Sequence, residues 1–197
     1  MDRRAFFQQA LRKTGRQVVK QVDARVSQRA SRWIRPPHAL DELEFLLACT
    51  RCNACVEACP EQLIFPLPSR LGAQVVATPA LDLLHKACAL CEDWPCVAAC
   101  EPGALRLPEV EEEAARPLPR LARLEIDPAS CLPYSGPECG ACSGSCPVPG
   151  ALGWMGPRPQ IDAGRCIGCA QCRSACILDP PAMRLVTRPA PAGTEAE

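Results

Sequence analysis

Hydrophobic positions in the first 35 residues recur at steps of four and seven, which is the spacing of one face of an α-helix. These positions are Phe7, Leu11, Val18, Val22, Val26 and Trp33. Basic side chains occupy the other faces, at Arg12, Lys13, Arg16, Lys20, Arg25 and Arg29. An apolar stripe of this kind is typical of an amphipathic helix. We therefore expect residues 1–35 to form a basic amphipathic helix.

From residue 36 onward the hydrophobic pattern changes to short apolar stretches separated by proline, glycine and polar residues. Strand candidates are residues 63–65, 104–107, 122–127, 150–154, 160–162 and 182–187. A Gly/Pro turn at 156–159 separates two of these candidates and predicts a hairpin. The pattern predicts a small, loop-rich α+β body over residues 36–188. The polar tail, residues 189–197, is expected to be disordered.

The composition explains how so irregular a body could hold together. The 197 residues include 22 Pro and 16 Cys, but aromatic residues make up only 4%. This composition argues against a large conventional core and therefore against a Rossmann or barrel enzyme. No apolar run approaches the roughly 18 residues of a membrane span, which excludes an integral membrane protein. Cysteine chemistry is expected to stabilise the fold.

The cysteines fall into four runs of four, and none is left over. Run one is Cys49, Cys52, Cys55 and Cys59, and run two is Cys88, Cys91, Cys96 and Cys100. Run three is Cys131, Cys139, Cys142 and Cys146, and run four is Cys166, Cys169, Cys172 and Cys176. This is an internal repeat.

Runs one and four have the spacing C-x2-C-x2-C-x3-C, as in two-cluster bacterial ferredoxins, whereas run two is spaced x2, x4, x3 and run three x7, x2, x3. Three cysteines on a tight loop can turn their sulfurs toward one iron–sulfur cube, while the fourth begins a short helix and ligates the partner cluster. Sixteen cysteines then make four [4Fe–4S] clusters in two ferredoxin-like modules, each with two clusters. All sixteen are predicted to be cofactor and metal ligands. Because each cluster has four thiolates, no iron is left open for catalysis, and the chain is predicted to be an electron carrier and not an enzyme.

Two other uses of cysteine remain as alternatives. A disulfide framework suits small secreted chains, but it gives no reason for every run to close at four. Zinc sites use C-x2-C halves, but they rarely use three sulfurs two residues apart with a fourth three residues beyond. Iron–sulfur clusters are the favoured interpretation.

The four runs can pair into two modules in two ways. The 19 residues between Cys146 and Cys166 match a two-cluster ferredoxin, which favours pairing run one with two and run three with four. Residues 66–86 show no clear hairpin, which favours a crossover that pairs run one with four and run two with three. We favour this nested pairing. The ligands are the same in either case.

Charge is distributed unevenly along the chain. Residues 1–35 hold ten basic and two acidic residues, a net charge of +8, and the remaining residues carry −8. The segment is predicted either to pack on the body or to dock a partner protein, and contact with a membrane surface stays open. Arg3 and Arg4 resemble a twin-arginine export signal, but charges interrupt the apolar region that should follow. We therefore expect the protein to be cytoplasmic.

The remaining candidates carry less weight. His38 and His85 are expected at the surface, and Trp94 and Tyr134 are expected to pack over the clusters and exclude water. The sequence has no phosphate-binding loop. The basic segment lacks aromatic residues interleaved for stacking on bases, so no nucleic-acid partner is expected.

Several longer motifs include or flank runs one and three: residues 31–37 (SRWIRPP), 44–46 (EFL), 49–55 (CTRCNAC), and 131–135 (CLPYS) with 138–139 (EC). These motifs resemble those of the NapF-type ferredoxins, which accompany the periplasmic nitrate reductase system. Run two differs, because residues 92–95 (EDWP) lengthen its gap in a way more similar to NapG/MauM-type ferredoxins.

The resemblance implies a cytoplasmic iron–sulfur protein that binds a molybdoenzyme catalytic subunit before export and helps its maturation by moving electrons. The expected partner is that subunit or another redox protein, docked through the N-terminal helix. Two alternatives remain: a permanent electron-transfer subunit of a redox complex, and an assembly chaperone whose clusters are structural only.

Overall fold

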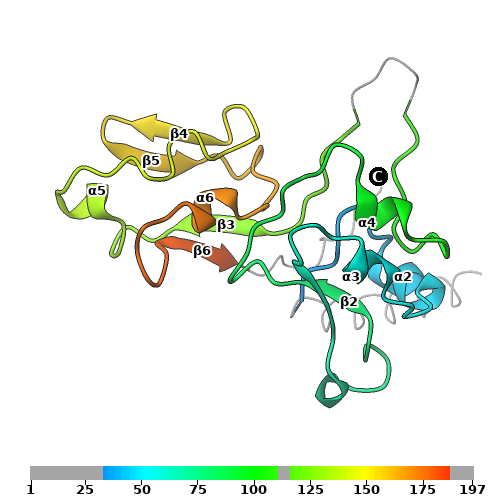
Figure 1. Ribbon diagram of the computed structural model, residues 1–197. Coiled ribbons are helices and arrows are strands. Elements are labelled where there is room, and N and C mark those ends of the chain that lie inside the picture. The colour runs from blue at the N-terminus through cyan, green and yellow to red at the C-terminus, as the bar shows by residue number, and fades with distance from the viewer. Residues whose placement is uncertain (1–32, 111–115, 187–197) are drawn as a thin grey trace, which may run out of the picture.

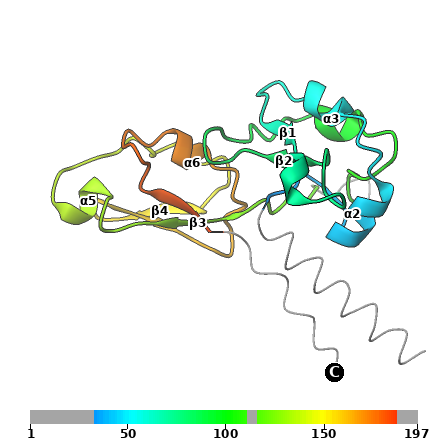
Figure 2. The same ribbon diagram turned by 90° about the horizontal axis from the view of Figure 1, so that it is seen from below.

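The described part of the chain forms two modules that lie side by side. The computed structural model describes residues 33–110 and 116–186. Figure 1 shows α2, α3, α4 and β2 in one module, and α5, α6 and β3 to β6 in the other. The view turned by 90° separates the same two groups (Figure 2). We call residues 33–107 the first module and residues 121–186 the second module. The small, loop-rich α+β architecture is as predicted.

The first module is built from short elements around one hairpin. Its elements are α2 (Glu42–Ala48), α3 (Ala54–Glu57), β1 (Ile64–Pro66), a 3₁₀ turn (Ser69–Leu71), β2 (Pro79–Leu81) and α4 (Pro95–Ala98). Strands β1 and β2 are antiparallel, with Ile64 opposite Leu81. Isolated bridges join Ile34 to Leu81 and Ala39 to Leu105. The strand expected over residues 104–107 is therefore a single bridge.

The second module contains two strand pairs. Its elements are β3 (Arg123–Ile126), α5 (Leu132–Ser135), β4 (Leu152–Met155), β5 (Arg158–Ile161), α6 (Gln171–Ser174) and β6 (Met183–Val186). The predicted hairpin is confirmed, because β4 and β5 pair on either side of the turn. The strand before run three, β3, pairs with the strand after run four, β6. This pairing encloses both runs in one unit.

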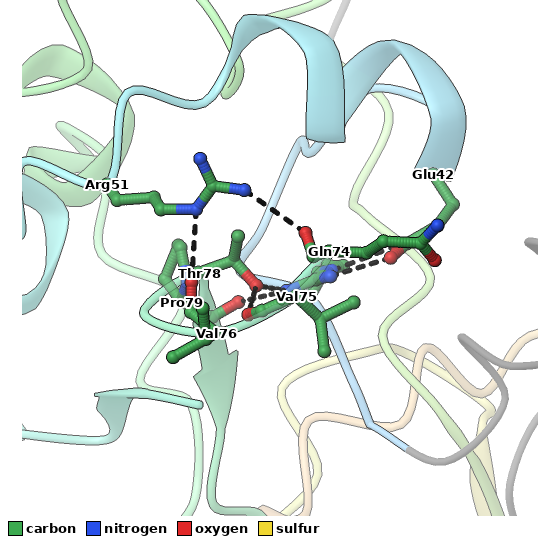
Figure 3. A network of polar contacts seen from close by, with 8 residues as sticks. Glu42, Arg51, Gln74, Val75, Val76, Thr78 and Pro79 are labelled. Atoms are coloured by element: carbon green, nitrogen blue, oxygen red, sulfur yellow. Dashed lines mark hydrogen bonds and ion pairs between the residues drawn. The ribbon is translucent and has the colours of Figure 1, made fainter. Parts of the chain in front are cut away.

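The hairpin in residues 63–81 was missed from the sequence because its connection is long and has no tight-turn signature. Polar side chains hold the connection (Figure 3). Arg35 donates to the Thr78 hydroxyl at 2.9 Å and the Pro79 carbonyl at 2.8 Å, and it also pairs with Glu42. Arg51 donates to the carbonyls of Val76 and Gln74 at 3.0 and 3.1 Å. Side chains far along the sequence thus satisfy loop carbonyls that a tight turn would have satisfied locally.

A continuous apolar core runs through both modules beneath the cysteine loops. Phe45, Leu63 and Leu83 are its largest fully buried side chains in the first module, and Leu124 and Met183 are the largest in the second. Among residues 33–110 and 116–186, no helix has the length and apolar character needed to cross a membrane.

Several sequence expectations concern residues that the structure does not describe. The basic helix expected over residues 1–35 lies outside the described residues up to residue 32. Its last three residues are not helical, because Ile34 forms a β-bridge and Arg35 belongs to the polar network of the first module. The tail, residues 189–197, also lies outside the described part.

Candidate metal centres

The sixteen cysteines gather into four groups, each with three cysteines from one run and one from another. We name these groups site I to site IV after the run that supplies the three. Site I contains Cys49, Cys52, Cys55 and Cys100, which line one cavity of about 330 Å³, open solvent at its mouth included. Cys49 follows the end of α2 and Cys55 lies in α3, so these two short helices position the loop between them.

Site II is the counterpart of site I in the same module. Its cavity, about 360 Å³ with its open mouth, is lined by Cys59, Cys88, Cys91 and Cys96. Cys59 comes from the end of run one, just as Cys100, in site I, comes from the end of run two. The two runs of the first module therefore exchange their fourth cysteines.

The second module repeats this exchange. Site III contains Cys131, Cys139, Cys142 and Cys176 around a cavity of about 340 Å³. Cys146 and Cys166 lie close enough to both Cys169 and Cys172 for their charges to raise the pKa of those two thiols. These four cysteines form site IV. Every predicted ligand is thus in a group of four.

The nested pairing that we favoured from the sequence is wrong in this structure. Cys59 lies with run two and not with run four, and Cys146 lies with run four and not with run two. The expectation failed because it rested on the apparent lack of a hairpin after run one. Strands β1 and β2 are that hairpin, and they return the chain to the same module.

Three of the four runs share one backbone conformation. The residue before the second cysteine is left-handed in runs one, two and four, at Arg51, Leu90 and Gly168. So is the residue two before the third cysteine, at Asn53, Trp94 and Ala170. Such turns wrap the loop so that successive side chains and amides face one centre. Run three, with its longer first gap, has neither conformation.

Burial sets the acid–base character of the innermost thiols. It raises the pKa of Cys55 and Cys88 to about 11, with smaller contributions from neighbouring sulfurs. It raises the pKa of Cys96 and Cys172 to about 12 for the same reasons. Without a metal these thiols keep their protons, so a metal that binds thiolates must displace those protons.

Backbone amides partly offset this burial. Amides of Leu90 and Gln171 hydrogen-bond to the sulfurs of Cys88 and Cys169 and lower their pKa values. The Leu105 amide donates to the Cys100 sulfur at 3.3 Å. Donors of this kind stabilise negative charge on cluster ligands and tune cluster potentials.

The donor sets fit [4Fe–4S] clusters better than either alternative. All sixteen cysteines are described and all are free thiols, which argues against a disulfide framework. A single zinc ion needs four sulfurs about 3.8 Å apart, given Zn–S bonds of about 2.3 Å. Across residues 33–110 and 116–186, no group of three or more His, Cys, Asp or Glu side chains is arranged to hold a single ion. Four sulfurs that line one cavity without the geometry of a single-ion site suit a multi-iron cube.

The predicted aromatic residues behave differently from each other. Trp94 is 8% exposed and lines site II, as expected. Tyr134 does not line site III; its hydroxyl donates to the Pro159 carbonyl at 2.8 Å and fastens α5 to β5. Trp154 lines site III instead. It was missed because it lies within a predicted strand, where an aromatic residue is ordinary.

The two histidines also differ. His85 is exposed and pairs with Asp82, as expected for a surface residue. His38 is half-buried, which corrects our expectation. Its ring packs edge-on against that of Trp94, with the two ring centroids 4.6 Å apart. Burial, and secondarily Arg116, lowers the pKa of His38. Neither histidine lines the cavities of sites I to III.

Comparisons with known proteins agree with this chemistry. Residues 87–151 match a family model described as a 4Fe-4S dicluster domain. The chain is 32% identical to the methylamine utilization ferredoxin-type protein MauM of Methylobacillus flagellatus, over 95% of this chain and 84% of that protein. It is 30% identical to the ferredoxin-type protein NapG of Escherichia coli K12, over 93% and 85% of the two chains. It is 33% identical to NapF of the same organism, over 75% and 82%.

The extent of these matches adds two points. The dicluster match takes in runs two and three, which the structure places in different modules. The family model matches two consecutive runs, whereas the structure shows which runs exchange their fourth cysteines. No solved structure matches the chain.

Proposed function

Because the chain belongs to the ferredoxin-type iron–sulfur proteins represented by MauM, NapG and NapF, we propose that it carries one electron at a time through four [4Fe–4S] clusters on behalf of a partner redox enzyme. The chain is thus an electron carrier and not an enzyme. The number of clusters and the service to a partner are the proposal.

The observation that carries the proposal is the complete use of the cysteines. Four groups of four sulfurs account for all sixteen residues, and each group draws its fourth member from the other run of its module. When bound, each cluster supplies a one-electron couple. The residues around it exclude water, as Phe45 and Trp94 do beside sites I and II, and donate amide hydrogens to the ligand sulfurs.

The direct test is the metal content of protein purified without oxygen. Four clusters require about sixteen irons and sixteen sulfides per chain, at four of each per cluster. Reduction should produce the electron paramagnetic resonance signals of [4Fe–4S]⁺ centres. Stoichiometric zinc after anaerobic reconstitution, or iron for two clusters only, would contradict the proposal.

We propose that the partner docks on the N-terminal segment. The segment carries a net charge of +8, against −8 for the rest of the chain. Its apolar stripe must be buried against another surface, because exposed apolar patches of this size promote aggregation. The charge of the segment would speed its association with the partner, and the apolar stripe would supply affinity. The NapF resemblance favours a molybdoenzyme catalytic subunit as the partner. The name of MauM refers instead to methylamine utilization, so the proposal covers a redox enzyme of either kind.

Deletion of residues 1–30 tests this docking. The truncated protein should keep its full iron content but lose co-purification with its partner. Phe7→Glu with Val18→Glu should act in the same way at any salt concentration, whereas Arg12→Glu with Arg16→Glu should weaken binding mainly at low salt. A truncated protein that loses iron would show that the segment is structural.

We also propose that the protein resides in the cytoplasm. Arg12, Lys13 and Arg16 interrupt the apolar region that an export signal requires after Arg3 and Arg4. A fusion of residues 1–35 to a reporter active only after export should therefore stay silent. A reporter that is active, and silent again after Arg3→Lys with Arg4→Lys, would overturn this assignment.

A further inference from the structure

The exchange of fourth cysteines connects sites I and II within the first module and sites III and IV within the second. Nothing in that exchange says which site of one module faces which site of the other. The hydrogen bonds between the described parts of the two modules supply this information, because each joins run four to run two or to the chain just before run two.

The closest of these contacts joins two of the proposed ligands themselves. The amide of Cys88, in site II, donates to the carbonyl of Cys169, in site IV, at 2.8 Å. The sulfurs of the two sites are therefore linked by the covalent bonds of two cysteines and a single hydrogen bond. The sulfur of Cys169 also lies close enough to that of Cys88 for its charge to raise the pKa of the Cys88 thiol.

Side chains of α6 reinforce this contact. The amide nitrogen of Gln171 donates to the Cys88 carbonyl at 3.0 Å, so Cys88 is held by both its backbone donor and its backbone acceptor. Arg173 donates to the Leu84 carbonyl at 3.3 Å. Figures 1 and 2 agree with this arrangement, because α6 lies toward the first module and α5 lies at the far end of the second.

The loop of run four is also held from its other side. The Leu121 amide donates to the Ile167 carbonyl at 2.8 Å, where the chain enters the second module. Gly168 adopts φ +72°, and a Cβ there would come within 2.1 Å of the Ala122 carbonyl oxygen. The loop carrying Cys166 and Cys169 is thus clamped between the entering chain and Cys88, which fixes its position relative to site II.

From these contacts we infer that the four sites form one unbranched series in the order I, II, IV, III, with Gln171 as the positioning residue of the central junction. The inference rests on the proposed function, since it orders the clusters that the sites would hold. It makes sites I and III the two ends of the molecule. Chain order alone would have joined site II to site III.

The order can be tested with two matched double variants, each designed to keep two clusters. Cys52→Ala with Cys139→Ala removes one ligand from each end site and should keep the clusters of sites II and IV. Cys91→Ala with Cys166→Ala should keep the clusters of sites I and III. None of the four replaced cysteines is fully buried. Both proteins are purified without oxygen, assayed for iron and reduced with dithionite.

Electron paramagnetic resonance of the frozen, reduced proteins distinguishes the possible orders. The variant that keeps sites II and IV should show signals split or broadened by spin–spin interaction. The variant that keeps sites I and III should show the sum of two isolated signals. Coupling in the second variant and not in the first, or in neither, would overturn the order.

A single variant of the fully loaded protein provides an independent measurement. Gln171→Ala should keep wild-type iron content but weaken the magnetic interaction between sites II and IV. The control is Gln160→Ala, because Gln160 is exposed on β5 and, among the described residues, its side-chain amide hydrogen-bonds only to the Met155 sulfur. Equal spectra for the two variants, or iron loss confined to Gln171→Ala, would overturn the positioning role.

These outcomes separate failure of the order from failure of the proposed function. A wild-type protein that takes up no iron–sulfur clusters would refute the proposed function. A wild-type protein with four clusters, whose variants couple in the wrong pair, would refute only the order.

Discussion

The two modules hold eight cysteines each, yet they bury different amounts of other side chain around them. Five of the largest fully buried side chains lie in the first module: Phe45, Leu63, Leu83, Thr78 and Pro36. The second module contributes three: Leu124, Met183 and Pro159. The only aromatic side chain in this group, Phe45, is in the first module. The Arg35 guanidinium lies over its ring, with Cζ 4.5 Å from the ring centroid.

Polar contacts differ in the same direction. In the first module Arg35 and Glu42 form an ion pair with side chains only 10% and 9% exposed. In the second module Arg123 and Glu125 pair with about half of each side chain exposed. Exposed pairs contribute little to stability, whereas loss of one partner from a buried pair leaves a buried charge uncompensated and is costly. The second module therefore has less besides its metal sites to hold it folded.

The largest effect that follows from this comparison concerns cluster removal. Treatment with a chelator and an oxidant should unfold residues 121–186 completely and leave partial protection in residues 33–107, because apolar burial has to offset conformational entropy in each module. Hydrogen exchange read by mass spectrometry can follow both modules at once. Equal loss of protection in the two modules, or none in either, would show that the difference in packing is unimportant.

The next effect concerns single clusters and should be alike in both modules. Because Cys59 lies in site II, Cys59→Ala should remove the same spectroscopic signal as Cys91→Ala. Cys52→Ala and Cys100→Ala should share a different signal. The comparison requires difference spectra of the reduced proteins at equal iron content. If Cys59→Ala matched Cys52→Ala instead, the exchange of fourth cysteines would be wrong.

These cysteine assignments separate what the sequence could predict from what it could not. Cysteine spacing and turn residues predicted the four runs, most of the short strands around them and the hairpin of β4 and β5. Spacing along the chain is local information, and the ligand loops are local structures. The gathering of all sixteen cysteines into groups of four was predictable for that reason.

The partner of each run was not predictable, because it depends on contacts between distant residues. The connection over residues 67–78 has no turn signature, and Arg35 and Arg51 hold it from outside. His38 looked like a surface residue because nothing near it in sequence indicates that Trp94 covers it. The junction of Cys88 with Cys169 spans 81 residues and left no local pattern.

A smaller effect than ligand loss is expected from the polar network. Arg35→Ala leaves Glu42 buried without its partner and frees the carbonyl of Pro79, so it should destabilise residues 67–81 by about 3 kcal/mol. The matched control in the second module is Arg123→Ala, which breaks an exposed pair and should cost less than about 0.5 kcal/mol. Local opening free energies from hydrogen exchange measure both. Similar values for the two variants would show that the polar contacts of the two modules do not differ in their contribution to stability.

The smallest effect concerns mild acid, and it should be confined to the first module because both histidines of the chain lie there. The pKa of His38 is lowered from 6.5 because burial, and secondarily Arg116, oppose the imidazolium. Its Nε2 is buried and finds no hydrogen-bond partner among the described residues. The unfolded chain therefore takes up this proton first as the pH falls. The stability contributed by His38 is present above pH 6.5 and is lost as the pH falls through the lower pKa of the folded state.

Two variants isolate this contribution to the free energy of unfolding. His38→Asn removes the titration and suits the local backbone, because φ is +56° and asparagine tolerates the left-handed region. Between pH 7.5 and about 5.5, above the range in which ordinary carboxylates take up protons, opening of residues 36–41 should become easier in the wild type but change less in His38→Asn. His85→Asn should behave like the wild type, because the His85 side chain is 77% exposed. The second module has no histidine and should show no such step, so a matching loss of protection in residues 121–186 would assign the acid response to the metal sites instead.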